Sequence, residues 1–266
     1  MNIKKALLVT FSTGLIATTL VNTNYVSAEE ANVGSKTESD VEVKFTQDTS
    51  TAPELINPLK PGEPNDLEGL ENEGKVTSET GSLTLDYVSN FNFGVNEVNL
   101  KGDEYNAVTT LDDGLHFLHV TDRRGPDKGW HVTASLDEFK NKENPSLPGA
   151  TIHLKDTEAV SDLELFINPF VNKEIKLESN NEAVDIASSS GGKVDKAQGV
   201  GSWVVRWLDR EAQSDTNNEG KFENRNVYLK VPQASASKGE HETQITWTLT
   251  DGPSVNHDTL NQSENE

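Results

Sequence analysis

Apolar and polar residues alternate with a period of two in segment after segment of this chain beyond Gly81. In Trp130–Leu136, for example, His131, Thr133 and Ser135 fill the positions between apolar residues. Successive side chains of a β-strand point to opposite faces of the sheet, so this pattern predicts a strand with one buried face. No window carries the i, i+3, i+4, i+7 apolar stripe of a long amphipathic helix. We therefore predict an all-β fold.

Further segments show the same alternation and are separated by clusters of Gly, Asn, Asp and Pro, which favour turns. They are Leu83–Tyr87, Leu115–Val120, Ile152–Leu154, Leu163–Ile167, Val204–Leu208, Val227–Val231 and Ile245–Leu249. Upstream, Val41–Phe45 alternates in the same way and predicts a first strand. Together these segments predict a single antiparallel domain, either β-sandwich-like or an open barrel.

The residues around this domain are typical of an exported protein. Residues 1–28 combine Lys4 and Lys5, the apolar stretch Ala6–Leu20 and a small-residue exit at Val26–Ala28, as a secretory signal peptide does. We expect residues 29–40 to be a short disordered tether, because they are too polar to bury a core. The β domain is expected over residues 41–253, with a Pro-rich loop at 52–80, and a flexible tail over 254–266.

We expect the mature chain to be secreted and then released or held at the cell wall noncovalently. No segment after the leader approaches the roughly 20 apolar residues that a transmembrane helix needs. Residues 256–266 are polar and carry no sorting signal of the LPxTG type. The chain has no cysteine, so its stability must come from its core and not from disulfides.

The charge of the chain excludes one class of partner. It holds 23 Lys and Arg against 44 Asp and Glu, a net charge of −21. Removal of the leader takes away two lysines and no acid, which leaves 21 cations against 44 acids and a net charge of −23. Nucleic acid is not expected as a partner, because binding to phosphates needs a basic surface.

Candidate catalytic and metal-binding residues are few. His116 and His119 are the closest pair of histidines, but their odd spacing on a strand sends them to opposite faces, where they cannot chelate one ion. There is no cysteine and no G-x-S-x-G nucleophile elbow. Carboxylates are so abundant that no single pair is informative. We expect no catalytic residue, no metal, no cofactor and no enzymatic activity.

Asp215–Gly220 has oxygen ligands at alternate positions followed by glycine, which is similar to the start of an EF-hand loop. Position twelve of such a loop would be Asn226 in place of the bidentate glutamate, and no flanking helices are expected. A solvated hairpin loop is therefore favoured over a calcium site. Calcium binding by this loop stays an open alternative.

The four tryptophans are candidates both for the core and for stacking on sugar rings. Trp130 and Trp247 each head an apolar strand face, which favours the core. For Trp203 and Trp207 the spacing does not separate the two roles.

Two segments resemble the two signature motifs of the WxL-domain cell-wall proteins of Gram-positive bacteria. They are Gly129–Ala134, which reads GWHVTA, and Trp247–Pro253, which reads WTLTDGP. Supporting similarities lie at Val120–Gly125, Gly201–Trp203 and Phe91–Gly94. The first motif departs from the family pattern, because Val132 stands where the family has leucine.

This resemblance implies a surface protein that attaches noncovalently by binding peptidoglycan, with Trp130, Val132, Trp247 and Leu249 as the residues of the cell-wall-binding motifs. It also implies a membrane-anchored, WxL-interacting surface protein as a partner. The sequence leaves two alternatives open. One is an adhesin or assembly component whose main ligand is a host matrix protein or that membrane-anchored partner. The other, less favoured, is a secreted glycan or peptide hydrolase that uses a carboxylate pair.

Overall fold

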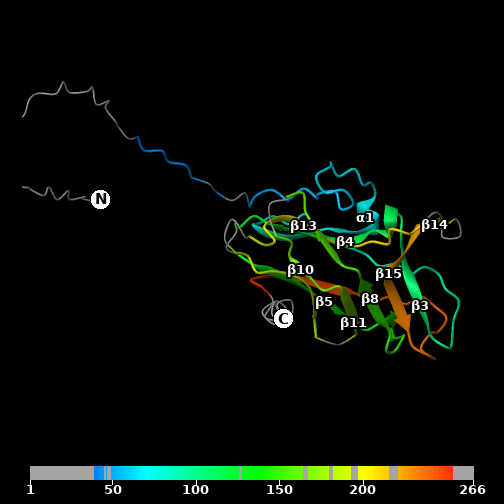
Figure 1. Cartoon of the computed structure of the whole chain (residues 1–266). Helices are drawn as coiled ribbons and strands as arrows, with labels where there is room; N and C mark the ends of the chain where they lie inside the picture. Colours follow the sequence, from blue (N-terminus) through cyan, green and yellow to red (C-terminus); the bar gives the residue numbers. More distant parts are fainter. Residues whose placement is uncertain are drawn as a thin grey trace, which may run out of the picture. The chain divides into compact units, whose positions relative to one another are not determined.

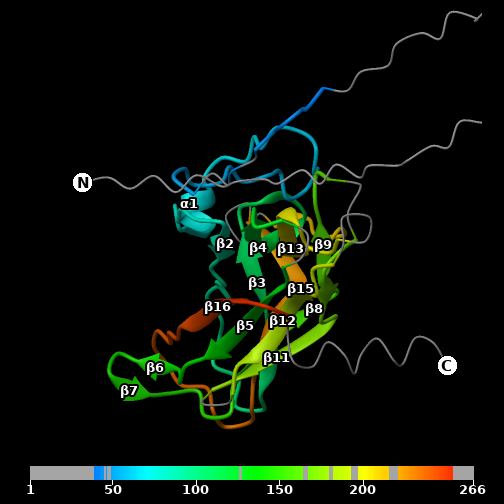
Figure 2. The ribbon, with the colours of Figure 1, turned by 90° about the vertical axis from the view of Figure 1, so that its left-hand side faces the viewer.

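The computed structural model describes residues 39–44, 46, 49–125, 128–163, 167–179, 182–192, 197–215 and 221–253. The chain divides into two units, Met1–Lys44 and Phe45–Glu266, and every element below belongs to the second unit. This unit is built almost wholly from antiparallel strands (Figure 1). They form three larger sheets and one short hairpin, β6 (Lys140–Asn141) with β7 (Asn144–Pro145) (Figure 2). The predicted all-β class is confirmed, and none of the sheets closes into a barrel.

The first sheet has the order β1-β2-β4-β13-β9 and consists of β1 (Gly74–Val76), β2 (Leu83–Ser89), β4 (His116–Asp122), β13 (Gly201–Trp207) and β9 (Glu158–Val160). The second sheet has the order β10-β12-β5-β16 and consists of β10 (Phe170–Val171), β12 (Val184–Ser189), β5 (Trp130–Leu136) and β16 (Ile245–Asp251) (Figure 2).

The third sheet has the order β11-β8-β15-β14, and β3 also pairs with β15. Its strands are β11 (Glu174–Glu178), β8 (Thr151–Lys155), β15 (Lys221–Val231), β14 (Ser214–Asp215) and β3 (Asp103–Thr109). The described helical segments are short: α1 (Leu70–Glu73) and the 3₁₀ turn η1 (Asp112–Gly114).

Strand β4 is buried along its whole length because both of its faces are covered. Leu118 and Val120 lie in the main core, which draws residues from all three sheets. Phe117, on the opposite face, belongs to a second cluster, where it stacks on Tyr87 with ring centroids 4.3 Å apart. The alternation of β4 therefore separates two cores, whereas that of β5 separates core from surface.

The predicted Pro-rich loop is packed against the first sheet over its first half. Leu55 and Ile56 contact the second cluster, and this segment lies across the first sheet (cyan in Figures 1 and 2). The Ile56 N–H donates to Nε2 of buried His119 at 3.3 Å, while Nδ1 of the same ring lies 2.8 Å from Asp86. Arg206 donates from Nη1 to the Pro58 carbonyl at 2.5 Å. Buried polar groups thus hold the segment in place.

The imidazole of His116 gives one pH-dependent prediction. Burial lowers its pKa to about 4, and a hydrogen bond with the Gly114 carbonyl opposes this shift only in part. An unfolded chain binds the same proton near pH 6.5, so protonation favours unfolding as the pH falls from about 6.5 to about 4, by about 3 kcal/mol in total. We expect His116→Gln to flatten the fall in unfolding free energy between pH 7 and pH 4, measured by urea denaturation. Equal pH slopes for the two proteins would contradict this.

Two predicted strands differ in the structure. Over the described residues 41–44 there is no strand, and Val41 and Val43 are 91% and 71% exposed, so the prediction of a strand at Val41–Phe45 is wrong there. A segment that alternates but has no partner strand forms no sheet, so these valines have no apolar surface to pack against. In Leu163–Ile167 both end residues are exposed and Ile167 makes only an isolated bridge. Residues 164–166 and Phe45 lie outside the described residues.

Candidate functional site

The two segments that resemble the family motifs form neighbouring strands. β5 carries the first motif and β16 the second, and the two strands pair antiparallel over seven residues each. In this register Val132 lies opposite Leu249, and Trp130 lies opposite Asp251. Strand β5 lies between β12 and β16, and β16 is the last strand on its side of the second sheet (Figure 2). The fold therefore joins two motifs that are far apart in the sequence into one surface.

The four predicted motif residues point to the inner face of this sheet. Trp130 and Val132 are 0% exposed, while Trp247 and Leu249 are half-buried and pack against the main core. The Trp130 indole donates from Nε1 to the Gly199 carbonyl at 2.8 Å. The first pair therefore has no surface to offer a ligand in this structure, and the valine that replaces leucine in the first motif serves packing.

The outer face of the same two strands is rich in hydroxyl groups. It carries six side chains, which we call the hydroxyl face: His131, Thr133, Ser135, Thr246, Thr248 and Thr250. They stand in three cross-strand pairs, of which Thr133 with Thr248 is the central one. The three threonines of β16 are exposed and the β5 residues are half-buried. Each hydroxyl can both donate and accept a hydrogen bond, so this face suits a polar ligand with many hydroxyl or amide groups.

The ends of the two motif strands are joined by an arginine clasp. Arg124 binds buried Asp122 through two nitrogens at 2.9 Å each, and its Nη2 also donates to the Gly129 carbonyl at 2.7 Å. Its Nη1 contacts Asp251 at the end of β16. Burial disfavours the charge on Arg124, but the hydrogen bonds and charges of Asp122 and Asp251 outweigh this and raise its pKa above the usual value. The clasp thus fixes the register of the two motifs.

Position 129 has no room for a side chain. A Cβ on Gly129 would collide with the Ser189 carbonyl oxygen on β12 and press on Pro253. The Gly129 carbonyl accepts a hydrogen bond from the Gly252 N–H at 2.9 Å, and the Gly252 carbonyl lies 2.8 Å from Nδ1 of His131. The glycine of the first motif and the Gly-Pro of the second are therefore needed where the start of β5 and the end of β16 approach each other closely.

The other two tryptophans are core residues. Trp203 and Trp207 are 1% and 0% exposed. The Trp203 indole donates to the Val200 carbonyl at 2.9 Å, and that of Trp207 donates to the Thr157 hydroxyl at 3.0 Å. The Trp207 ring lies 6.1 Å from that of Trp247, between centroids, so it supports the second motif from inside.

The structure tests the metal candidates in part. His116 and His119 lie on opposite faces of β4, as predicted, with His116 beside Asn224 and His119 beside Asp86. Among the described residues no group of three His, Asp or Glu is placed to hold a metal ion. The candidate loop Asp215–Gly220 lies outside the described residues except for Asp215, at the end of β14. No helix in the described part of the chain is long and apolar enough to cross a membrane.

Two parts of this site do not follow from the sequence. The Thr alternation on β16 is visible, but nothing shows that β5 lies beside it, and no local pattern assigns Arg124 the role of joining the two strands. The available signals are the similarity to the family at Val120–Gly125, which contains Asp122 and Arg124, and the Asp-Gly-Pro that ends the second motif, which supplies Asp251 to the clasp.

Comparison with known proteins places the chain in a family. The model of the family described as "WxL domain surface cell wall-binding" matches residues 32–253, which include all the described strands. No curated protein and no solved structure matches the chain. The matched region contains both motif strands and the clasp that joins them. The chain therefore belongs to the WxL family of surface cell-wall-binding domains.

Proposed function

We propose that this protein is secreted through its N-terminal leader and attaches noncovalently to the cell surface by binding peptidoglycan, with the hydroxyl face as the contact surface. One observation carries the proposal: the two family motifs lie side by side, and the surface that they expose is the hydroxyl face. The buried Trp130 and Val132 then shape this face from behind. The half-buried Trp247 and Leu249 support the edge strand from the same inner side.

The charge of the protein favours this kind of contact. A net charge of −23 for the mature chain opposes approach to a wall that carries anionic polymers. Screening confines that repulsion to about 8 Å at about 0.15 M salt, so attachment must come from short-range contacts. Hydroxyl and amide groups of glycan and stem peptide provide such contacts for threonine side chains.

Sedimentation with purified peptidoglycan tests the proposal. We expect Thr246→Ala, Thr248→Ala and Thr250→Ala together to weaken binding at least about tenfold, because each neutral hydrogen bond contributes about 0.5–1.5 kcal/mol. A matched triple variant, Thr80→Ala, Gln213→Ala and Gln233→Ala, changes exposed polar residues elsewhere and should bind like the wild type. Both variants should keep the wild-type melting temperature, because exposed substitutions change stability little.

The same assay across a salt series, with and without teichoic acid on the wall, tests the physical cause. Binding should persist or strengthen as salt increases, because screening weakens the like-charge repulsion. Binding that falls steeply with salt would mean that ionic attraction holds the protein on the wall and would refute the mechanism. Equal binding by the two triple variants would remove the hydroxyl face from the proposal. Deleting a motif strand is a poor substitute, because β5 is paired on both sides.

We further propose that the protein is not an enzyme. The family to which it belongs is described by binding to the wall and not by a reaction. Incubation of the protein with purified walls should release no soluble muropeptides above a buffer control. Release of such fragments would establish the hydrolase alternative.

A further inference from the structure

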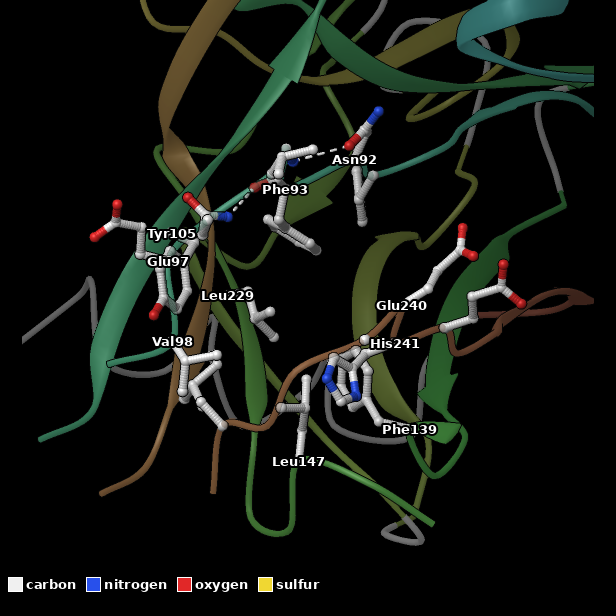
Figure 3. Close-up of a pocket in the computed structure, with 18 of the residues that line it drawn as sticks. Asn92, Phe93, Glu97, Val98, Tyr105, Phe139, Leu147, Leu229, Glu240 and His241 are labelled. Atoms are coloured by element: carbon white, nitrogen blue, oxygen red, sulfur yellow. Dashed lines mark hydrogen bonds between the residues drawn. The ribbon is translucent and has the colours of Figure 1, made fainter. Parts of the chain in front are cut away.

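A separate groove lies between the loop that follows β2 and the chain that leads into β16. It has a volume of about 910 Å³. Residues 91–98 form one wall, and residues 236–237 and 239–242 form the other (Figure 3). A volume of this size is in the range of pockets that bind small ligands, about 300–1,000 Å³.

The floor of the groove is apolar. Phe93, Tyr105 and Leu229 lie on it from one side, and Phe139 and Leu147 from the other (Figure 3). Most of these residues pack against the main core, so the floor is continuous with the interior of the domain. Leu229, Phe139 and Leu147 are at most 7% exposed, so an occupant with apolar side chains would mainly cover the half-buried Phe93 and Tyr105 and remove their surface from water.

The loop that forms the first wall exposes apolar residues in a turn that side-chain hydrogen bonds hold in place. Val95 and Val98 are 104% and 49% exposed, and both line the groove. The Gly94 N–H donates to Oδ1 of Asn92 at 2.9 Å, and Nδ2 of Asn96 donates to the Phe93 carbonyl at 2.7 Å (dashed in Figure 3). These side-chain hydrogen bonds set the turn without any help from the valines. The valines are therefore available to a partner.

Both walls of the groove are acidic. Glu97 stands on the first wall and Glu240 on the second, on opposite sides in Figure 3, and Glu242 also lines the groove. All three side chains are exposed, and against them the lining offers the one ammonium group of Lys221. Such a groove attracts cationic groups and repels anionic polymers.

We propose that this groove binds an extended segment of a partner protein in which apolar residues alternate with lysine or arginine. The apolar residues would occupy the floor and contact Val95 and Val98, and the basic residues would reach Glu97 and Glu240 on the two walls. The site is distinct from the hydroxyl face. Phe91 lines the groove, and its ring lies 6.4 Å from that of Trp247, between centroids, on the inner side of the motif strands. A protein on the wall can thus hold a second protein.

Fluorescence anisotropy with labelled synthetic peptides tests this proposal on the full chain. The probe is a ten-residue peptide that alternates valine and lysine; two comparison peptides replace its lysines by glutamate or its valines by serine. We expect saturable binding of the valine-lysine peptide and at least about tenfold weaker binding of both comparison peptides, because each lacks one of the two complementary features.

Three variants locate the binding. The groove variant Glu97→Gln, Glu240→Gln and Glu242→Gln should weaken binding about tenfold, because it removes the exposed carboxylates that would pair with the lysines. The variant Val95→Ser and Val98→Ser should weaken it by a similar factor. The matched control is Glu54→Gln, Glu68→Gln and Glu71→Gln, which removes the same number of negative charges at exposed positions outside the groove. It should bind the peptide within about twofold of the wild type.

Several results would overturn the proposal. They are the absence of saturable binding of the valine-lysine peptide up to about 1 mM, equal weakening by the groove and control variants, and equal binding of the serine-lysine peptide. Self-association that Val95→Ser and Val98→Ser abolish would assign the groove to a second copy of the chain. Loss of peptidoglycan sedimentation in the groove variants would assign it to the wall. Wild-type sedimentation together with loss of peptide binding separates this proposal from the proposed function.

Discussion

Replacing Trp130 with alanine is expected to lower the free energy of unfolding by about 3–5 kcal/mol, the range measured when a buried tryptophan is truncated. The side chain is 0% exposed and lies at the start of β5, in a core to which strands of all three larger sheets contribute. Its truncation leaves a cavity and also leaves the Gly199 carbonyl without its indole donor. Urea denaturation at neutral pH measures the change.

The second motif supplies the matched comparison. Trp247 is half-buried, so Trp247→Ala should cost less, about 2 kcal/mol. Thr248→Ala, on the exposed face of the same strand, should change stability by less than about 0.5 kcal/mol. If Trp130→Ala left the unfolding free energy unchanged, the packing of the first motif described above would be incorrect, and a binding role for that ring would regain support.

Replacing Arg124 with methionine should destabilise the domain by about 3–5 kcal/mol, because removal of one partner leaves the other charge buried and unpaired. The Asp122 side chain is 0% exposed and receives two hydrogen bonds from the Arg124 guanidinium, besides one from the Arg124 backbone N–H. The same arginine joins the start of β5 to the end of β16 through Gly129 and Asp251. We therefore expect Arg124→Met also to weaken peptidoglycan binding at temperatures where the domain is still folded.

Two further variants separate the contributions. Asp251→Asn should have a small effect, about 1 kcal/mol or less, because this carboxylate is 73% exposed. Adding Asp122→Asn to Arg124→Met should recover part of the lost stability, since the uncompensated charge is then removed. A double variant as unstable as Arg124→Met alone would show that the buried charge is not the cause. Thermal unfolding of the four proteins provides the measurement.

Side-chain alternation determined much of what could be predicted. The faces of β5 and β16, the inward direction of Trp130 and Trp247 and the opposite placement of His116 and His119 all follow from the period of two, which is a property of a single strand. The family could also be identified from sequence, because its two motifs are short, local and in the expected order. These parts required no knowledge of which strands are neighbours.

Side-chain alternation did not predict the structure correctly where that structure depends on contacts with distant segments. Val41–Lys44 alternates as well as β16 does, yet no strand pairs with it among the described residues. The Pro-rich segment was expected to be a loop, and nothing local to it indicates the hydrogen bonds from Arg206 or to His119 that hold it on the first sheet. A strand or a packed segment depends on backbone and side-chain partners that lie elsewhere in the chain.

The sequence by itself therefore determined the all-β class, the inner and outer face of each motif strand and membership of the WxL family. Only the tertiary structure decided that β5 and β16 are neighbours, that their outward residues merge into one hydroxyl face, that Arg124 joins their ends and that an acidic groove lies nearby. The physical reason is that side-chain periodicity is set locally by backbone geometry. Strand order and register, in contrast, follow from non-local hydrogen bonding and the burial of a shared core.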